Sequence, residues 1–324
     1  MKGMHSAQGV GNLKEVIVHC PGDELDILNP RNLKDYLFDG LVYKEEAEEE
    51  HNGFVAKLEE AGVRVNRLSE LLKNIAKGKD GRFLRNVIKK LPNMFFIRDL
   101  AVVTSSGGII ANMHHAARSV EPAVMKSILE EMGIPILCEI EPPGELEGGD
   151  ILFLDKDTML VGLSERTNEE GIRQIKEAWL KEGRTLVKIP IRLVRESMHL
   201  DAVIGIVSKT CICVHLPSIV GNFTVYWIDN GQQRQRVPTI EDFLAVRGIS
   251  RIEVTWAEQF RMACNGLMVE PGKNIICYQR SFSKDSLQAL RQRGVAVTML
   301  YLPQLFLGGG GPHCMTLELE REEE

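Results

Sequence analysis

The sequence has no pair of cysteines at the spacing of a zinc-binding or redox motif. Its seven cysteines are scattered and odd in number, which argues against a disulfide framework and against a zinc site. We expect reduced thiols, several of them inside apolar strand-like runs where packing explains them. They are Cys20, Cys138, Cys211, Cys213, Cys264, Cys277 and Cys314. Only Cys314 is preceded by a glycine-rich, polar segment.

The chain also lacks long apolar runs and an excess of basic residues. No uninterrupted apolar run approaches the roughly 20 residues needed to cross a bilayer, and the first residues lack the apolar core of a signal peptide. The net charge of -6 gives no electrostatic footprint for nucleic acid. We therefore expect a cytoplasmic protein that binds a small molecule, with no nucleic acid and no membrane partner. The sequence is compatible with a homo-oligomer.

What the sequence does contain is an internal repeat. From residue 99 onward, a polar residue is followed by a short apolar strand, a turn, a second strand and an amphipathic helix. Four such units begin at Asp99, Asp150, Asp201 and Asn265, the first three at equal intervals. Their helices are predicted over residues 120–132, 168–181, 239–246 and 284–293.

A fifth unit can be assembled from the two ends of the chain. It combines strands over 15–20, 295–301 and 315–319 with a helix over 44–61. Self-similar units that bury one face against their neighbours indicate a solenoid or a propeller-like ring, and a unit built from both ends favours closure. In such a ring the polar strand starts converge on a central channel together with Cys314.

The run from Gly308 to Thr316 places Cys314 behind flexible backbone that can approach a ligand closely. That setting makes Cys314 a candidate nucleophile. Taken alone, the run fits a glycine-rich tail with a buried, inert cysteine at least as well. Its meaning therefore depends on the residues that join it.

Several acids and one histidine lie at the strand starts. His199 and Asp201 are two residues apart, so in a strand both side chains would point to one face. Glu147 and Asp150 flank two glycines, which suits a tight turn that presents both carboxylates, although an ordinary turn before a strand fits equally well. Asp99 precedes the first repeat strand.

A thiol, an imidazole and four carboxylates make a strongly anionic pocket that attracts a cation. A planar guanidinium fits best, because a carboxylate binds it through two parallel charge-assisted hydrogen bonds. A thiolate can then attack its central carbon. A metal hydrolase is disfavoured, since the remaining histidines, including His114 and His115, show no metal-binding spacing.

With these residues the chain closely resembles the arginine deiminases of the guanidino-group-modifying (amidinotransferase or pentein) superfamily. The matching motifs are Asn93 with Phe96-Ile97-Arg98-Asp99, Met113 with Arg118 and Glu121, Glu147-Gly148-Gly149-Asp150, Ser164-Glu165-Arg166-Thr167, Met198-His199-Leu200-Asp201 and Gly309 to Thr316. The resemblance implies an α/β fold of five pseudo-symmetric blades, a five-bladed α/β propeller. It implies one catalytic domain over residues 1–324. Only a short insertion at about 63–92, with at most a basic helix around 83–90, replaces the helical bundle of bacterial relatives.

The resemblance also assigns roles to the converging residues. Cys314 would be the nucleophile that forms a covalent thiouronium intermediate, and His199 the acid and base that protonates ammonia and then activates water. Asp99 and Asp201 would grip the guanidinium nitrogens, while Glu147 would orient His199.

Further residues are implied at the amino-acid end of the substrate. Asn93, Phe96 and Arg166 would surround that end, with Arg166 on its carboxylate. Asp150, Gly309 and His114 complete the substrate-binding candidates. Two of these are departures, since the family usually has a second carboxylate-binding arginine at the position of His114 and often an arginine at that of Gly309. The candidates for the missing contact are His114, His115 and Arg118.

The implied reaction is a hydrolysis without cofactor or metal, which converts arginine and water to citrulline and ammonia. An amidinotransferase, in which an amine attacks the covalent intermediate, would use the same residues. Hydrolysis of citrulline or another guanidino compound is a third variant. A non-catalytic ribosome-binding propeller is a remote alternative, because such a protein has no reason to keep the thiol, imidazole and carboxylates together.

Overall fold

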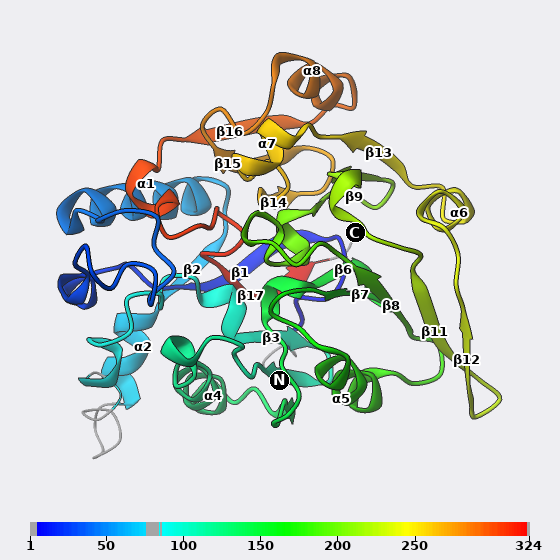
Figure 1. Ribbon diagram of the computed structural model, residues 1–324, viewed down its shortest axis with the longest axis horizontal. Helices are drawn as coiled ribbons and strands as arrows, with labels where there is room; N and C mark the ends of the chain where they lie inside the picture. Colours follow the sequence, from blue (N-terminus) through cyan, green and yellow to red (C-terminus); the bar gives the residue numbers. More distant parts are fainter. Residues whose placement is uncertain (1–4, 76–83, 85, 323–324) are drawn as a thin grey trace.

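The computed structural model describes residues 5–75, 84 and 86–322. Within these residues the strands form five separate sheets, and Figure 1 shows the helices around the outside of the molecule. The α/β class predicted from the sequence is confirmed. The sheets are not joined into one closed sheet, so the propeller form stays a prediction.

One plan recurs in all five sheets. In the first, β3 (Ala101–Thr104) and β4 (Gly107–Ile110) form an antiparallel hairpin, and α4 (Glu121–Glu131) then leads to β5 (Ile136–Glu139), which pairs parallel with β4. A helix between two parallel strands is the usual crossover connection, because a hairpin turn cannot join them. The unit is therefore strand, strand, helix, strand.

The other units follow this order along the chain. The second contains β6 (Ile151–Asp155), β7 (Thr158–Leu163), α5 (Glu169–Trp179) and β8 (Thr185–Pro190), and its sheet is extended by β11 (Thr224–Asp229) and β12 (Gln232–Arg236). The third contains β9 (Ile204–Ser208), β10 (Cys211–Val214), α6 (Ile240–Val246) and β13 (Ser250–Glu253). The fourth contains β14 (Leu267–Glu270), β15 (Asn274–Tyr278), α8 (Lys284–Gln292) and β16 (Ala296–Leu300).

The fifth sheet joins the two ends of the chain. It contains β17 (Leu317–Glu322), β1 (Asn12–Val18) and β2 (Arg64–Arg67), with α1 (Lys44–Glu60) between the last two. The remaining short helices are α2 (Leu68–Ile75), α7 (Trp256–Phe260) and α9 (Pro303–Phe306). The strand expected over 295–301 was assigned to this sheet, and that assignment is wrong. That strand is β16, which follows α8 and pairs parallel with β15.

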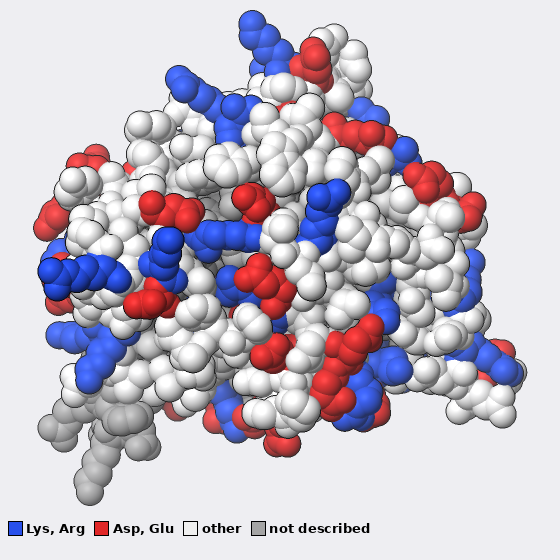
Figure 2. Space-filling view, in the orientation of Figure 1, with Lys and Arg blue, Asp and Glu red and all other residues white. Residues whose placement is uncertain are grey.

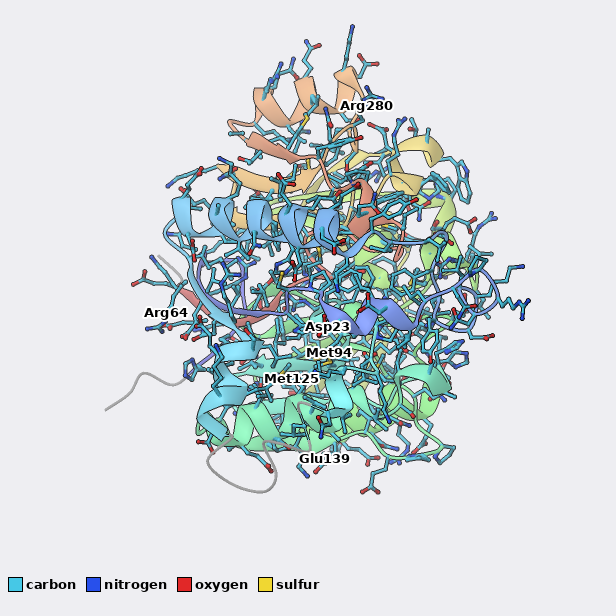
Figure 3. The ribbon with its side chains drawn as sticks, turned by 90° about the vertical axis from the view of Figure 1, so that its left-hand side faces the viewer. Asp23, Arg64, Met94, Met125, Glu139 and Arg280 are labelled. Carbon is cyan, nitrogen blue, oxygen red and sulfur yellow. The ribbon has the colours of Figure 1, made fainter. Side chains whose placement is uncertain are left out.

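The helix predicted around 83–90 lies partly outside the described residues, and residues 86–88 are helical. The core of this region includes Met94 and Met125, both fully buried in one cluster and labelled in Figure 3. Arg64 on β2 and Glu139 on β5, labelled in the same view, belong to strands at the edges of their sheets.

Charge is mixed over the surface. Figure 2 shows acidic and basic side chains interspersed over one face, without a basic stripe. No helix in the described part of the chain is long and apolar enough to span a membrane.

Short 3-10 turns precede the first strands of three units and carry the predicted site residues. They cover Ile97–Leu100, Gly148–Asp150 and Leu200–Ala202. The prediction that His199 and Asp201 lie on one face of a strand is wrong, because His199 caps the third turn and Asp201 lies within it. Tight turns place polar side chains next to the buried strand ends without breaking a sheet ladder.

Candidate active site

Cys314 lies in a loop that Asn265 holds together. The Asn265 side-chain oxygen accepts hydrogen bonds from the backbone N–H groups of Gly311 (3.0 Å) and Cys314 (3.2 Å). Its Nδ2 lies 3.1 Å from the Cys314 sulfur. Asn265 was predicted only as the polar start of the fourth unit, and that equivalence with Asp99 and Asp201 was the signal for its role.

The Cys314 thiol is buried beside carboxylates. Its sulfur is 3.6 Å from Asp201 Oδ2. Burial, followed by the negative charges of Asp201 and Asp99, raises the pKa of the Cys314 thiol well above its usual value. At neutral pH the free protein therefore holds a thiol here, whereas a bound cation would favour the thiolate.

His199 is paired with two acids. Its Nε2 is 2.8 Å from Glu147 Oε2, and its Nδ1 is 3.7 Å from Asp99 Oδ1. Burial alone would lower the pKa of His199, but the charges of Asp99, Glu147 and Asp150 outweigh it and raise that pKa to about 10. His199 is therefore an imidazolium at neutral pH.

Glu147 is the matching anion. Burial alone would raise the pKa of Glu147, but the hydrogen bond and charge of His199, with Arg166 and Arg118, lower it to about 2. The carboxylate is fully buried behind His199. It holds the ring rather than contacting the cavity.

Two carboxylates each have one oxygen without a hydrogen bond. Asp99 Oδ2 accepts a hydrogen bond from Arg118 Nη1 (2.6 Å), and Asp201 Oδ2 accepts one from His313 Nδ1 (2.8 Å). The other oxygen of each, Oδ1, is buried without a hydrogen-bond partner among the described residues. Buried polar atoms normally have a partner, so these two oxygens indicate where a donor-rich ligand belongs.

A cavity opens onto Asp99, His199 and Cys314. Its lining includes the predicted residues Asn93, Phe96, Asp99, Arg166, His199, Gly309 and Cys314. It also includes Arg118, which was a candidate for the missing carboxylate contact, and residues that were not predicted as site residues, namely Leu37, Arg195, Met198, Gly308 and Gly310. Asp201 reaches the cysteine from the side and lines a neighbouring cavity instead.

Asp150 does not line this cavity. Its oxygens accept hydrogen bonds from Ser164 (2.6 Å), Thr167 (2.7 Å) and the backbone N–H of Leu200 (2.8 Å). Burial raises the pKa of Asp150 to about 7, although these hydrogen bonds act to lower it. Asp150 therefore ties the second unit to the turn that carries His199, and the expected substrate contact is not seen.

His114 does not line the cavity either. Its side chain is exposed and its Nδ1 is 3.0 Å from Glu145 Oε2. Arg118 does line the cavity, but its guanidinium is occupied by Asp99, Glu121 and the carbonyl of Phe96. His115 is absent from the lining. Of the candidates for the missing carboxylate contact, none is both in the cavity and free to bind.

The described residues contain two groups whose ligand atoms lie within 4.8 Å of one another and could hold a metal ion: Asp99 with Glu147 and His199, and His5 with Glu15 and Glu320. A metal needs a neutral imidazole. The raised pKa of His199 works against that in the first group. In the second, Glu15 is already paired with Arg64.

The fold and site have counterparts among known proteins. A family model described as arginine deiminase matches residues 34–85 and 81–321. An arginine deiminase of Listeria welshimeri is 27% identical over 407 aligned positions, which cover 99% of this chain and 99% of that protein. One of Rhodococcus erythropolis is 28% identical over 393 positions, covering 97% and 96%.

Solved structures show the same α/β fold. The N-terminal domain of ArgZ, an arginine dihydrolase from cyanobacteria, has a TM-score of 0.69 at 19% identity, covering 94% of this chain and 96% of that one. Unliganded AgrE has a TM-score of 0.71 at 17% identity, and the match covers 95% of this chain but only 40% of AgrE.

The matched residues include Cys314, His199 and the carboxylates of Asp99, Glu147 and Asp201. The chain belongs to the arginine deiminase family. The family and enzyme class predicted from the sequence are confirmed.

Proposed function

We propose that this chain hydrolyses arginine to citrulline and ammonia through a covalent intermediate on Cys314. The observation that carries the proposal is that Asp99 and Asp201, each with one carboxylate oxygen that lacks a hydrogen bond, lie near Cys314. Asp201 Oδ2 is 3.6 Å from the Cys314 sulfur, and Asp99 lines the same cavity as Cys314. A guanidinium has five N–H donors in a planar fork, so it can satisfy both oxygens at once. Its central carbon then faces the thiol.

The first half-reaction forms the intermediate. The bound guanidinium favours loss of the Cys314 proton to solvent, and the thiolate sulfur adds to the guanidinium carbon. The imidazolium of His199 donates its proton to one amino nitrogen, and the bond from carbon to that nitrogen breaks to release ammonia. Carbon remains bonded to sulfur as a thiouronium cation, and His199 is neutral.

The second half-reaction uses the same imidazole. Neutral His199 accepts a proton from water as the water oxygen adds to the thiouronium carbon. The carbon–sulfur bond breaks, the thiolate of Cys314 departs, and the remaining hydroxyl proton passes to solvent as citrulline forms. Glu147 holds the ring in place through both steps, and its negative charge stabilises the imidazolium.

The remaining residues would bind the amino-acid end of the substrate. Arg166, which is buried and lines the cavity, would contact the carboxylate. Its Nε has no hydrogen bond and lies 3.6 Å from Glu165 Oε1. Asn93 and Phe96 would enclose the chain beside it. Asp150 and His114 are kept as supports outside the cavity.

Support also comes from proteins with this fold. One solved structure is a binary complex of an AgrE mutant with L-arginine, and another is the N-terminal domain of an ArgZ mutant covalently bound to a reaction intermediate. These share 17% and 19% of their sequence with this chain.

We also propose that residues 1–324 form one catalytic domain, with the five sheets as blades of a propeller. The pairing of β1 with β17 supports this form, since it places both ends in one unit. The 324 residues of this chain are aligned over 407 positions with the Listeria welshimeri protein, so the alignment contains gaps in this chain. Such gaps agree with a short segment at about 63–92 in place of a longer insertion. A homo-oligomer, the cytoplasmic location and the absence of nucleic-acid partners stay predictions of the sequence.

The test is to measure ammonia and citrulline from arginine with wild-type protein and with Cys314→Ala. We expect equal amounts of both products from wild-type protein and a loss of at least about a thousandfold in kcat for the variant, because the covalent route is closed. The matched control is Cys277→Ala, a buried cysteine in β15 outside the cavity. Normal ammonia release by Cys314→Ala would contradict the mechanism.

The products also separate the alternatives. Ornithine in place of citrulline would make the reaction a dihydrolase, the activity named for ArgZ. New guanidino products that appear only with an added amine, without ammonia, would make the protein an amidinotransferase.

A further inference from the structure

The position of Gly309 leads to Arg195, a residue from another part of the chain. Gly309 has a φ of 87°, and a Cβ placed on it would lie 3.0 Å from Arg195 Nη2 and 3.6 Å from Met198 Cε. A side chain at this position would therefore point at the Arg195 guanidinium. The space beside Gly309 is thus bordered by an arginine from residue 195.

We infer that Arg195 binds the carboxylate of the substrate and so makes this protein selective for guanidino compounds that carry one. The inference rests on the proposed function, since it concerns the same cavity. It assigns a specificity role to a residue outside the family motifs found in the sequence.

Of the arginines that line the cavity, Arg195 is the one most available to bind a substrate carboxylate. Three arginines line the cavity: Arg118, Arg166 and Arg195. Arg118 is held by two carboxylates and a carbonyl. That leaves Arg166 and Arg195, and two guanidinium groups on one carboxylate provide the charge-assisted contacts that give both affinity and orientation.

The present partners of Arg195 hold its side chain in position and leave its positive charge available to a ligand. Nη2 donates to the Leu37 carbonyl at 2.6 Å, and Nε donates to Asp39 Oδ1 at 3.2 Å. The side chain of Asp39 is 60% exposed and that of Arg195 is 34% exposed. An ion pair this exposed to water is weak, so a substrate carboxylate can replace Asp39 at little cost in free energy. The hydrogen bond to the Leu37 carbonyl then keeps the Arg195 side chain in position.

Arg195 also marks where the substrate ends. Together with Met198 and Gly309 it lines a second cavity, whose other walls are Asp39, Glu196, Phe260, Met262, Phe306 and Leu307. Arg195 supplies the positive charge in this lining, and Asp39 and Glu196 supply negative charge. A carboxylate at the far end of a short guanidino substrate would meet it there.

The experiment compares arginine with agmatine, which is arginine without its carboxylate. In Arg195→Gln we expect the ratio of KM for arginine to KM for agmatine to rise about 10-fold or more, as for loss of a charge-assisted hydrogen bond. We expect kcat for arginine to change much less than KM. The matched control is Arg192→Gln, three residues away, exposed and bonded to the Pro217 carbonyl, which should leave the ratio unchanged.

A second variant tests the geometry directly. Arg195→Ala combined with Gly309→Arg places the guanidinium on the other side of the same gap, and we expect it to recover much of the arginine preference lost in Arg195→Ala alone. Circular dichroism checks that both variants fold. An unchanged KM ratio in Arg195→Gln, or equal losses for arginine and agmatine, would overturn the inference.

A binding measurement separates this inference from the proposed reaction. Calorimetry on Cys314→Ala compares the affinities for arginine and agmatine with and without Arg195→Gln, and it needs no turnover. A wild-type protein that releases ammonia from neither compound contradicts the proposed reaction. The calorimetric preference for arginine, and its loss in Arg195→Gln, still decide the role of Arg195.

Discussion

Cys314 and His199 are both buried, and their pKa values are raised for partly different reasons. Burial raises the pKa of the thiol and by itself would lower that of the imidazole. The nearby carboxylates add to the first effect and reverse the second. The free protein therefore holds a proton on both Cys314 and His199. In the proposed reaction, a guanidinium between Asp99 and Asp201 offsets the negative charge that opposes the thiolate, so the nucleophile forms in response to the substrate.

The protonation of His199 can be measured directly. Because its pKa is raised to about 10, we expect the imidazole to stay protonated through neutral pH and to lose its proton as the pH rises through about 10. Glu147→Gln removes one of the charges and the hydrogen bond to Nε2, so the pKa of His199 should fall in this variant. Imidazole nitrogen NMR against pH gives both values, with His199→Gln to assign the signal.

The control for that titration is Glu145→Gln. Glu145 lies two residues from Glu147 but contacts the exposed His114 instead. Its substitution should leave the His199 titration in place. Free-protein titration of His199 near its unperturbed pKa of about 6.5 would contradict the acid role proposed for it.

Helix α1 shows how single glycines act on an element. Gly53 lies inside this helix, and a Cβ placed there meets nothing within 4 Å. Gly62 lies just beyond its C-terminus with a φ of 80°, and its N–H donates to the Glu59 carbonyl while that of Val63 donates to Leu58. These two bonds form a Schellman motif, which requires the left-handed conformation at Gly62.

Opposite effects are therefore expected from the same substitution at two positions. Gly53→Ala should stabilise the protein by about 0.5–1 kcal/mol, since alanine has the higher helix propensity. Gly62→Ala should destabilise it by about 1 kcal/mol, since an L side chain is strained at positive φ. Thermal unfolding of both variants beside wild type provides the measurement. Destabilisation by Gly53→Ala would show a hidden contact on that face of α1.

The elements differ in how well the sequence predicts them. The helices and the first two strands of each repeat follow from apolar runs and caps, because strands buried on both faces read as continuous apolar stretches. Of the third strands, the sequence predicted β16 but not β2, β5, β8 or β13. β12 has the sequence QQRQR and is exposed at every residue, so only its pairing with β11 makes it a strand. β2 and β13 combine polar residues with a single apolar one, Val65 and Ile252.

The residues of the candidate site also differ in how well the sequence predicts them. Short motifs predicted Cys314, His199, Glu147, Asp99 and Asp201, which the structure brings together. The role of Arg195 could not be predicted, because its partner Leu37 is 158 residues away and the cavity between them exists only in the folded chain. Asp150 was predicted as a substrate-binding residue, but its carboxylate is bonded to Ser164, Thr167 and the backbone of Leu200, contacts that only the folded chain provides.

At the scale of the whole molecule, one buried acid connects the ends of the chain to the site. Glu318 on β17 accepts hydrogen bonds from Arg98 (2.6 Å) and Arg321 (2.5 Å). It also lies 3.7 Å from His313, whose other ring nitrogen is bonded to Asp201. The last strand is thereby linked to the first turn and to the cysteine loop. Residues 98 and 318 are far apart in the sequence, so this contact forms only when the ends meet.

Loss of Glu318 should therefore destabilise the whole fold. Glu318→Gln leaves two buried guanidinium groups without their carboxylate, and we expect a loss of about 3–5 kcal/mol in the free energy of unfolding by urea. The control is Glu322→Gln on the same strand, which removes only a surface contact to Lys14 and should change stability little. Equal losses in the two variants would contradict a central role for Glu318.

The same pair of variants gives a pH test with a defined sign. Burial alone would raise the pKa of Glu318, but Arg321 and Arg98 outweigh it and hold that pKa well below its usual range. A carboxyl with a lowered pKa contributes its stability fully above the unfolded value, about 4.3, and loses it as the pH falls below that value. Wild-type protein should therefore lose stability more steeply than Glu318→Gln in acid, while Glu322→Gln should follow wild type. Because His313 lies between Glu318 and Asp201, acid should weaken the proposed guanidinium site at the same time as the fold.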